Sequence, residues 1–202
     1  MNLHLLRHGL AADLGTDGIK RDSERPLTSE GREKLHRVTA AMQAMELSFD
    51  LILSSPFLRA RQTAEVVADA LKARKRMCLE DELACGGDVR ELAQRLARIR
   101  PAPENLLLVG HEPGLSELVS LLCAGTLQLA VSFKKGGLGR LEVGTLRCGR
   151  CATLVWLLTP KQMSLMAQSR APAVFAGSAG LCDSARTGPP SAQRRVKGFF
   201  FG

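Results

Sequence analysis

Short, continuous apolar runs recur along the chain and predict strands that are buried on both faces. Three of them cover residues 3–6, 51–53 and 106–109. A shorter run at 77–79 and two later ones at 138–143 and 152–158 complete the set, and a turn around Gly149 joins the last two. Runs without polar alternation are typical of a parallel sheet that helices cover on both sides.

Apolar residues spaced three or four positions apart lie between these runs and predict four amphipathic helices. Their apolar faces cover residues 35–45, 60–71, 89–99 and 115–122. Thr28 is expected to cap the first helix, and Asp88 with Glu91 to form a capping box at the third. Strands that alternate with helices predict an α/β fold with right-handed crossovers.

Charged residues gather where three of the predicted strands end. The clusters are Arg7-His8-Gly9, residues 54–63 and Gly110-His111-Glu112-Pro113. In sheets of this kind, ligands bind beyond the carboxyl ends of the strands, so the fold should bring the clusters together. His111 also precedes a helix, whose main-chain N–H groups add positive potential. Taken alone, His111 is equally well explained as a structural histidine.

The residue types in these clusters suit a phosphate ligand. Arg7 presents a planar fork of donors, His8 can act as nucleophile, base or donor, and Gly9 lets a ligand approach the backbone. Arg59 begins a helix and opposes its dipole, a local cost that indicates a bound anion. The alternative is that Arg59 and Arg61 are solvated helix residues, which cannot face the same way.

Composition and charge restrict the class of protein. The 202 residues are 45% apolar and 24% charged, which suits one globular domain with or without a tail. Residues 161–202 hold six Lys or Arg and one Asp, a charge of +5, so residues 1–160 carry only +3 of the total +8. That charge gives little reason to expect a nucleic-acid partner. After a short helical extension, the Gly-, Ser-, Pro- and Arg-rich sequence from residue 171 predicts a disordered basic tail.

Neither a membrane span nor export is expected. The chain has no apolar run of about 18 residues, and its first residues lack the basic and long apolar regions of a signal peptide. A cytoplasmic location with reduced cysteines follows. Cys148 and Cys151 form a lone C-x-x-C in a predicted turn, for which zinc or redox use is the less favoured interpretation.

Four motifs in order resemble the histidine phosphatase superfamily, the phosphoglycerate-mutase-like phosphatases. They are Leu6-Arg7-His8-Gly9, Arg25-Pro26-Leu27-Thr28 with Gly31, Ser54-Ser55-Pro56 through Arg59-Ala60 to Gln62-Thr63-Ala64, and Val109-Gly110-His111-Glu112-Pro113. Within that superfamily the chain resembles the short bacterial phosphohistidine phosphatases of the SixA type. The resemblance implies a domain over residues 1–160 with three α/β/α layers around a mostly parallel sheet. Residues 161–202 have no counterpart in it.

The resemblance also implies roles for individual residues. His8 would be the nucleophile that forms a phosphohistidine intermediate, and Arg7, Arg59 and His111 would hold the phosphoryl oxygens. Gly9 and Arg25 would belong to the substrate-binding set. The family needs no metal or other cofactor. These roles agree with the chemistry of the residues, because two fixed cations and a donor suit a transferring phosphoryl group.

The general acid is less defined by the sequence. Many superfamily members supply a Glu or Asp after the third strand, and Glu82 matches that position in Glu80-Asp81-Glu82-Leu83. The alternative is that these acids are exposed loop residues. Glu112 is a second candidate, unless it serves only the amino end of the following helix.

The substrate class follows from the space around the site and from the leaving group. Only 26 residues separate Leu79 from Leu106, which leaves little for a lid and favours a phosphorylated protein as substrate. Imidazole also leaves more readily than an alkoxide. The chain is therefore expected to act on protein phosphohistidine, for example in a histidine phosphotransfer domain. The alternatives are a phosphatase of small phosphate esters and a phosphate-binding module without catalysis.

Overall fold

A computed structural model describes residues 1–169, and the tail predicted from residue 171 lies outside these residues. The centre of the fold is a six-stranded sheet in the order β3-β2-β4-β1-β5-β6. The strands are β1 (Asn2–Arg7), β2 (Leu51–Ser54), β3 (Met77–Leu79), β4 (Asn105–Gly110), β5 (Leu138–Val143) and β6 (Ala152–Leu158). Each strand falls on one of the predicted apolar runs.

Four of the strands run parallel to one another. β4 pairs with β1 and with β2, and β2 pairs with β3, all in parallel register. The last two strands are antiparallel, because β5 pairs with β1 and β6 pairs with β5. The predicted α/β fold with a mostly parallel sheet is confirmed. The segments that follow β1, β2 and β4 consequently lie at one edge of the sheet.

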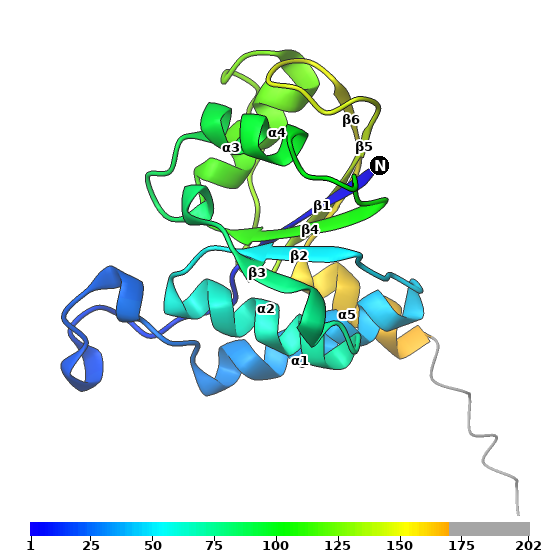
Figure 1. Ribbon diagram of the computed structural model, residues 1–202. Coiled ribbons are helices and arrows are strands. Elements are labelled where there is room, and N and C mark those ends of the chain that lie inside the picture. The colour runs from blue at the N-terminus through cyan, green and yellow to red at the C-terminus, as the bar shows by residue number, and fades with distance from the viewer. Residues whose placement is uncertain (170–202) are drawn as a thin grey trace, which may run out of the picture. The chain divides into compact units, whose positions relative to one another are not determined.

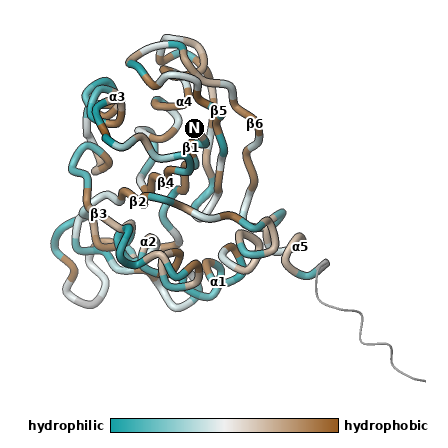
Figure 2. Tube along the Cα trace, turned by 45° about the vertical axis from the view of Figure 1, so that its right-hand side comes forward, coloured by the Kyte–Doolittle hydropathy of each residue, from teal (hydrophilic) through white to brown (hydrophobic). Residues whose placement is uncertain are grey.

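Helices cover both faces of this sheet (Figure 1). One face carries α3 (Val89–Ala97) and α4 (Gly114–Ala124), and the other carries α1 (Ser29–Ala44), α2 (Leu58–Ala70) and α5 (Pro160–Ser169). Leu107 and Leu108 of β4 belong to separate buried clusters, one on each face. Figure 2 shows hydrophobic segments along the central strands. Burial on both faces explains why the strands are continuous apolar runs rather than alternating ones.

Capping residues start two of the helices as the sequence predicts. The Thr28 hydroxyl accepts a hydrogen bond from the Gly31 N–H at 2.9 Å, at the start of α1. The Asp88 carboxylate accepts from the N–H of Arg90 at 2.7 Å, at the start of α3. The predicted capping box is only half formed, because the Glu91 carboxylate accepts from Arg95 instead. An ion pair one turn along the helix is the competing partner for that side chain.

A histidine lies buried in the core, away from the strand ends. His4 of β1 is 2% exposed, and its ring lies 5.1 Å from that of Phe49 and 5.9 Å from that of Trp156. Burial, with the Arg140 charge as a smaller cause, lowers the pKa of His4 to about 4. The unfolded chain binds this proton near pH 6.5, so protonation favours unfolding as the pH falls from 6.5 towards 4.

Replacing His4 should therefore weaken the pH dependence of stability. Between pH 7.5 and pH 5 we expect the wild type to lose about 2 kcal/mol through this residue, and His4→Leu to lack that part of the loss. Urea denaturation of both proteins at the two pH values measures it. Equal losses in wild type and His4→Leu would show that His4 does not carry the effect.

Candidate active site

The edge where the parallel strands end brings the predicted site residues together. Arg7 ends β1, and it pairs with Gly110 at the end of the neighbouring strand β4. His8 and His111 are the next residues on the two strands, and their ring centres lie 4.9 Å apart. Arg59 reaches the same point from the first turn of α2 and donates through Nε to Nε2 of His8 at 3.2 Å.

The hydrogen bonds of His8 define which ring nitrogen is free to react. Its side chain is 6% exposed, and Nδ1 lies 2.7 Å from the Gly9 carbonyl oxygen. A carbonyl only accepts, so Nδ1 carries the proton and Nε2 keeps its lone pair. Burial, assisted by the charges of Arg59, Arg7 and Lys135, lowers the pKa of His8 to about 4, although the Gly9 hydrogen bond raises it. At neutral pH the ring is therefore uncharged, and Nε2 carries the lone pair that a nucleophile needs.

His111 is held by a serine that the sequence reasoning had not singled out. Its Nε2 lies 2.8 Å from Oγ of Ser55, and this oxygen accepts from the Phe57 N–H at 3.2 Å. The Ser55 hydroxyl can then donate to Nε2, which leaves Nδ1 of His111 as a buried N–H without a partner among residues 1–169. Burial and the nearby charges lower the pKa of His111 to about 3. The ring is thus a neutral donor, available to a phosphoryl oxygen.

The buried guanidinium of Arg59 is neutralised by a carboxylate from the loop before α1. Asp22, in the short 3-10 helix η2 (Asp22–Glu24), accepts from it twice, through its main-chain oxygen at 2.6 Å and its carboxylate at 2.8 Å. Cys85 Sγ lies 3.3 Å from the same guanidinium. The charge at the start of α2 does have an anionic partner, and in this structure the partner is Asp22. Arg61 is half-exposed and pairs with Glu65, so only Arg61 is a solvated helix residue.

Arg25 belongs to the site through Asp22. It donates to the other carboxylate oxygen of Asp22 at 2.9 Å and to the Ala12 carbonyl oxygen at 2.6 Å. Desolvation raises the pKa of Asp22, but hydrogen bonds from Arg25 and Arg59 outweigh it and hold this pKa below its usual range. Asp22 therefore stays ionised between two arginines and links Arg25 to the arginine that contacts His8.

Arg7 and Gly9 lie on either side of His8 in the chain. Arg7 donates to the Phe133 carbonyl oxygen at 2.6 Å, and its buried Nε has no partner in the described part of the chain. Gly9 donates its N–H to Thr63 Oγ1 at 3.1 Å. A Cβ at Gly9 would lie 2.8 Å from Leu35 Cδ1, so a side chain here would require the buried Leu35 side chain of α1 to shift.

Both candidate acids have partners at the start of a helix. The Glu82 carboxylate accepts from the Asp88 N–H at 3.0 Å and lies 3.6 Å from an Arg95 nitrogen. Its contacts are therefore with the start of α3, and its role as proton donor stays a prediction. The Glu112 carboxylate accepts from the Ser116 N–H and from the Phe133 N–H at 2.6 Å. Glu112 thus fixes the main chain that binds Arg7.

The described residues 1–169 contain no group of three or more His, Cys, Asp or Glu placed to hold a metal ion. In the same part of the chain, no helix is long and apolar enough to cross a membrane. Cys148 and Cys151 are both free cysteines. The chemistry at the strand ends is a neutral imidazole nucleophile between fixed cationic and neutral donors. Such a set has the chemistry to accept a phosphoryl group on an imidazole and to stabilise its charge.

Comparison with known proteins gives the same class. A sequence model of the histidine phosphatase superfamily (branch 1) matches residues 3–84. The phosphohistidine phosphatase SixA of Escherichia coli K12 is 32% identical over 127 residues, which are 62% of this chain and 76% of that protein. An uncharacterized protein of Picosynechococcus sp. is 36% identical over 148 residues, 73% of this chain and 88% of that protein.

A solved structure agrees with this assignment. The protein histidine phosphatase SixA complexed with tungstate has a TM-score of 0.70 and 28% identity to this chain. The match covers 80% of this chain and 98% of that one. The chain belongs to the histidine phosphatase superfamily and is a phosphatase of the SixA type. The predicted family is confirmed.

Proposed function

We propose that this phosphatase hydrolyses phosphohistidine on other proteins and needs no metal ion. The observation that carries the proposal is the uncharged Nε2 of His8, which faces the Arg59 guanidinium at 3.2 Å. In the first step Nε2 attacks phosphorus, the bond from phosphorus to the substrate imidazole breaks, and that imidazole takes up a proton. In the second step water attacks the phosphoryl group on His8 and releases phosphate, and the Nε2 lone pair is restored.

The surrounding donors stabilise the charge that the phosphoryl group carries in both steps. When the phosphoryl group approaches, the Arg59 Nε–H gives up its hydrogen bond to Nε2 of His8 and donates to a phosphoryl oxygen instead. The unpartnered Nε–H of Arg7 and the Nδ1–H of His111 are two further donors. These groups are held in advance by Phe133 and Ser55, so little reorganisation is needed during the reaction.

The small number of residues around the site supports a protein substrate. Between β3 and β4 the chain forms only the short 3-10 helix η4 (Asp81–Leu83) and α3. The buried residues of α3 pack into the core rather than across the strand ends. His8 is buried, so only a small group such as a phosphoryl group can reach it. A large molecule can present that group from its own surface. The similarity to SixA of E. coli points to the same substrate class, of which a histidine phosphotransfer domain is an example.

Release of phosphate from a panel of substrates tests this function. The panel contains phosphorylated histidine phosphotransfer domains and small phosphate monoesters, all at the same pH and ionic strength. We expect kcat/KM to be at least a hundredfold higher for the phosphohistidine proteins. Higher values for the small esters would assign the enzyme to the phosphomonoesterases of the superfamily, and binding of phosphate without turnover would make it a binding module.

Replacement of Glu82 separates the two kinds of leaving group. To act as proton donor, the Glu82 carboxyl must leave its hydrogen bond with the Asp88 N–H and donate to the leaving oxygen instead. Glu82→Gln is then expected to slow cleavage of an alkyl phosphate by about 100-fold or more, because an alkoxide needs a proton to leave. Phosphohistidine cleavage should fall far less, since imidazole leaves readily and solvent can protonate it. Rates of both reactions are measured for the wild type and the variant.

Glu91→Gln is the matched control, because Glu91 also pairs with Arg95 but lies on the exposed side of α3. Unchanged ester cleavage in Glu82→Gln would show that another group is the acid. An equal fall for both substrates would contradict the leaving-group argument.

A further inference from the structure

A cavity opens beside His8, Arg59 and His111, which we call the catalytic cluster. It has a volume of about 330 Å³ and is lined by Arg7 and Gly9 but not by His8, Arg59 or His111. The apolar part of its wall comes from Leu10, Leu35, Val38 and Pro160, and the basic part from Lys34, Lys134 and Lys135. We call it the lysine pocket. Among the described residues 1–169, no Asp or Glu lines it. Lys34 is paired with Glu30, so the rim depends mainly on Lys134 and Lys135 for its positive charge.

The loop that carries two of the lysines is attached to the main chain of the nucleophile. The Gly136 N–H is shared between the carbonyl oxygens of Arg7 and His8, each at 3.0 Å, and the Arg7 N–H donates to the Gly137 carbonyl oxygen at 3.1 Å. Gly136 has a φ of 76°, which a residue with a side chain rarely adopts. Lys134 and Lys135 are both exposed, and these hydrogen bonds fix their loop beside the phosphoryl site.

The lining of the pocket indicates the chemistry of its occupant. An apolar wall with a basic rim fits an aliphatic side chain that has carboxylates next to it. The chain's own segment from Lys161 onward carries six Lys or Arg and one Asp, so its charge has the same sign as the rim. A second copy, at a net charge of +8, is disfavoured for the same reason. A partner with an acidic surface is favoured.

We propose that the lysine pocket receives an aliphatic side chain of the phosphorylated substrate protein, flanked by acidic residues, while the phosphohistidine enters the catalytic cluster. This inference rests on the proposed phosphohistidine phosphatase function and adds a specificity-determining surface to it. The two sites share Arg7 and Gly9, so both groups must come from one small area of the partner. Residues three or four positions from the phosphohistidine on a helix meet that requirement, because they lie one turn away on the same face.

Helical peptides with a single phosphohistidine test the proposal. The acidic peptide carries Glu three residues and Leu four residues after the phosphohistidine. A basic peptide has Lys in place of that Glu, and a polar peptide has Ser in place of that Leu. We expect wild-type kcat/KM to be at least tenfold higher for the acidic peptide than for either of the others. The preference over the basic peptide should shrink as salt is added, since exposed charges are screened.

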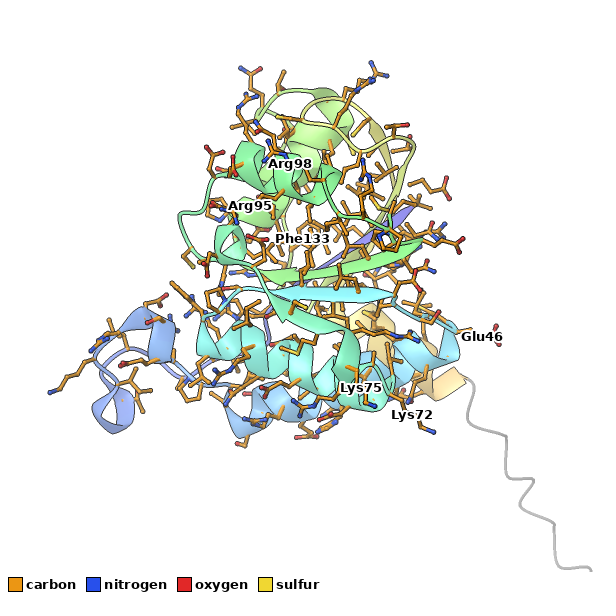
Figure 3. The ribbon with its side chains drawn as sticks, viewed as in Figure 1. Glu46, Lys72, Lys75, Arg95, Arg98 and Phe133 are labelled. Atoms are coloured by element: carbon orange, nitrogen blue, oxygen red, sulfur yellow. The ribbon has the colours of Figure 1, made fainter. Side chains whose placement is uncertain are left out.

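Charge reversal in the enzyme gives the matching result. Lys134→Glu should lower kcat/KM for the acidic peptide at least fivefold more than for p-nitrophenyl phosphate, and should raise it for the basic peptide. Lys75→Glu is the control, because Lys75 comes just before β3 and so lies at the amino ends of the parallel strands, whereas the site lies at their carboxyl ends. Figure 3 shows it well apart from Phe133, whose main chain binds Arg7. Lys75→Glu is expected neither to lower kcat/KM selectively for the acidic peptide nor to raise it for the basic peptide.

Three outcomes would overturn the proposal. Equal hydrolysis of the acidic and basic peptides by the wild type would show that the rim does not select charge. Equal effects of Lys134→Glu and Lys75→Glu would show that the pocket is not the place of selection. Hydrolysis of p-nitrophenyl phosphate but of no phosphohistidine peptide or protein would instead refute the proposed function, and the docking inference with it.

Discussion

Replacement of His8 by alanine is expected to lower kcat for any phosphate substrate by at least a hundredfold. The variant has no Nε2 to accept the phosphoryl group, so the two-step route is closed and only direct attack by water remains. The fold should persist, because the hydrogen bonds of this side chain are with the Gly9 carbonyl and with Arg59, which Asp22 continues to hold. Turnover of p-nitrophenyl phosphate and the melting temperature are measured together.

His36→Ala is the matched control for this prediction. His36 lies exposed on α1. Its main-chain oxygen accepts a hydrogen bond from the Thr39 hydroxyl, and this bond does not depend on the His36 side chain. It should keep turnover within about twofold, as surface substitutions away from a site usually do. Turnover of His8→Ala at wild-type level would remove His8 as the nucleophile.

Arg59→Ala is expected to reduce kcat/KM far more than Arg61→Ala, although the two arginines are neighbours on one helix. Arg59 is 4% exposed and contacts Nε2 of His8, whereas Arg61 is 47% exposed and pairs with Glu65. Losing a charge-assisted donor in the transition state costs about 3 kcal/mol, or roughly a hundredfold in rate. Losing an exposed ion pair costs less than about 1 kcal/mol. Steady-state kinetics with p-nitrophenyl phosphate give both values.

Arg7→Ala should resemble Arg59→Ala, because Arg7 is the second cation beside His8. Arg59→Lys tests whether charge alone is enough, and we expect it to recover little, since a lysine cannot reproduce the planar fork. Similar losses for Arg7→Ala, Arg59→Ala and Arg61→Ala would contradict the assignment of the first two to the phosphoryl group.

The strands and helices were predictable because burial leaves a periodic record in the sequence. β4 is apolar at every position from 106 to 109 since both of its faces are covered, and the large apolar residues Leu35, Val38 and Met42 of α1 recur on its one buried side. The meeting of His8 with His111 was predictable as well, because parallel strands end at a common edge. The apolar pattern within one segment was sufficient wherever burial of that segment alone determined its structure.

The partners of the site residues were not predictable in the same way. The dipole argument required an anion near Arg59, but it could not identify Asp22, which lies 37 residues away in a segment without periodicity. The link from Glu112 through Phe133 to Arg7 uses main-chain groups, which every residue possesses. Of these partners, Ser55 was the one that the sequence could have indicated, because it belongs to the same motif as Arg59. Tertiary contacts between irregular segments decide such details.

Trapping the enzyme during turnover tests the central claim most directly. Enzyme mixed with p-nitrophenyl phosphate or a phosphohistidine protein is quenched within milliseconds in alkaline denaturant, because the nitrogen–phosphorus bond of phosphohistidine breaks in acid. The mass of the intact chain and of its peptides is then measured. We predict a gain of one phosphoryl group on the peptide that contains His8, and none in His8→Ala. An unmodified wild-type chain during steady turnover, or a phosphoryl group on any other residue, would contradict the account.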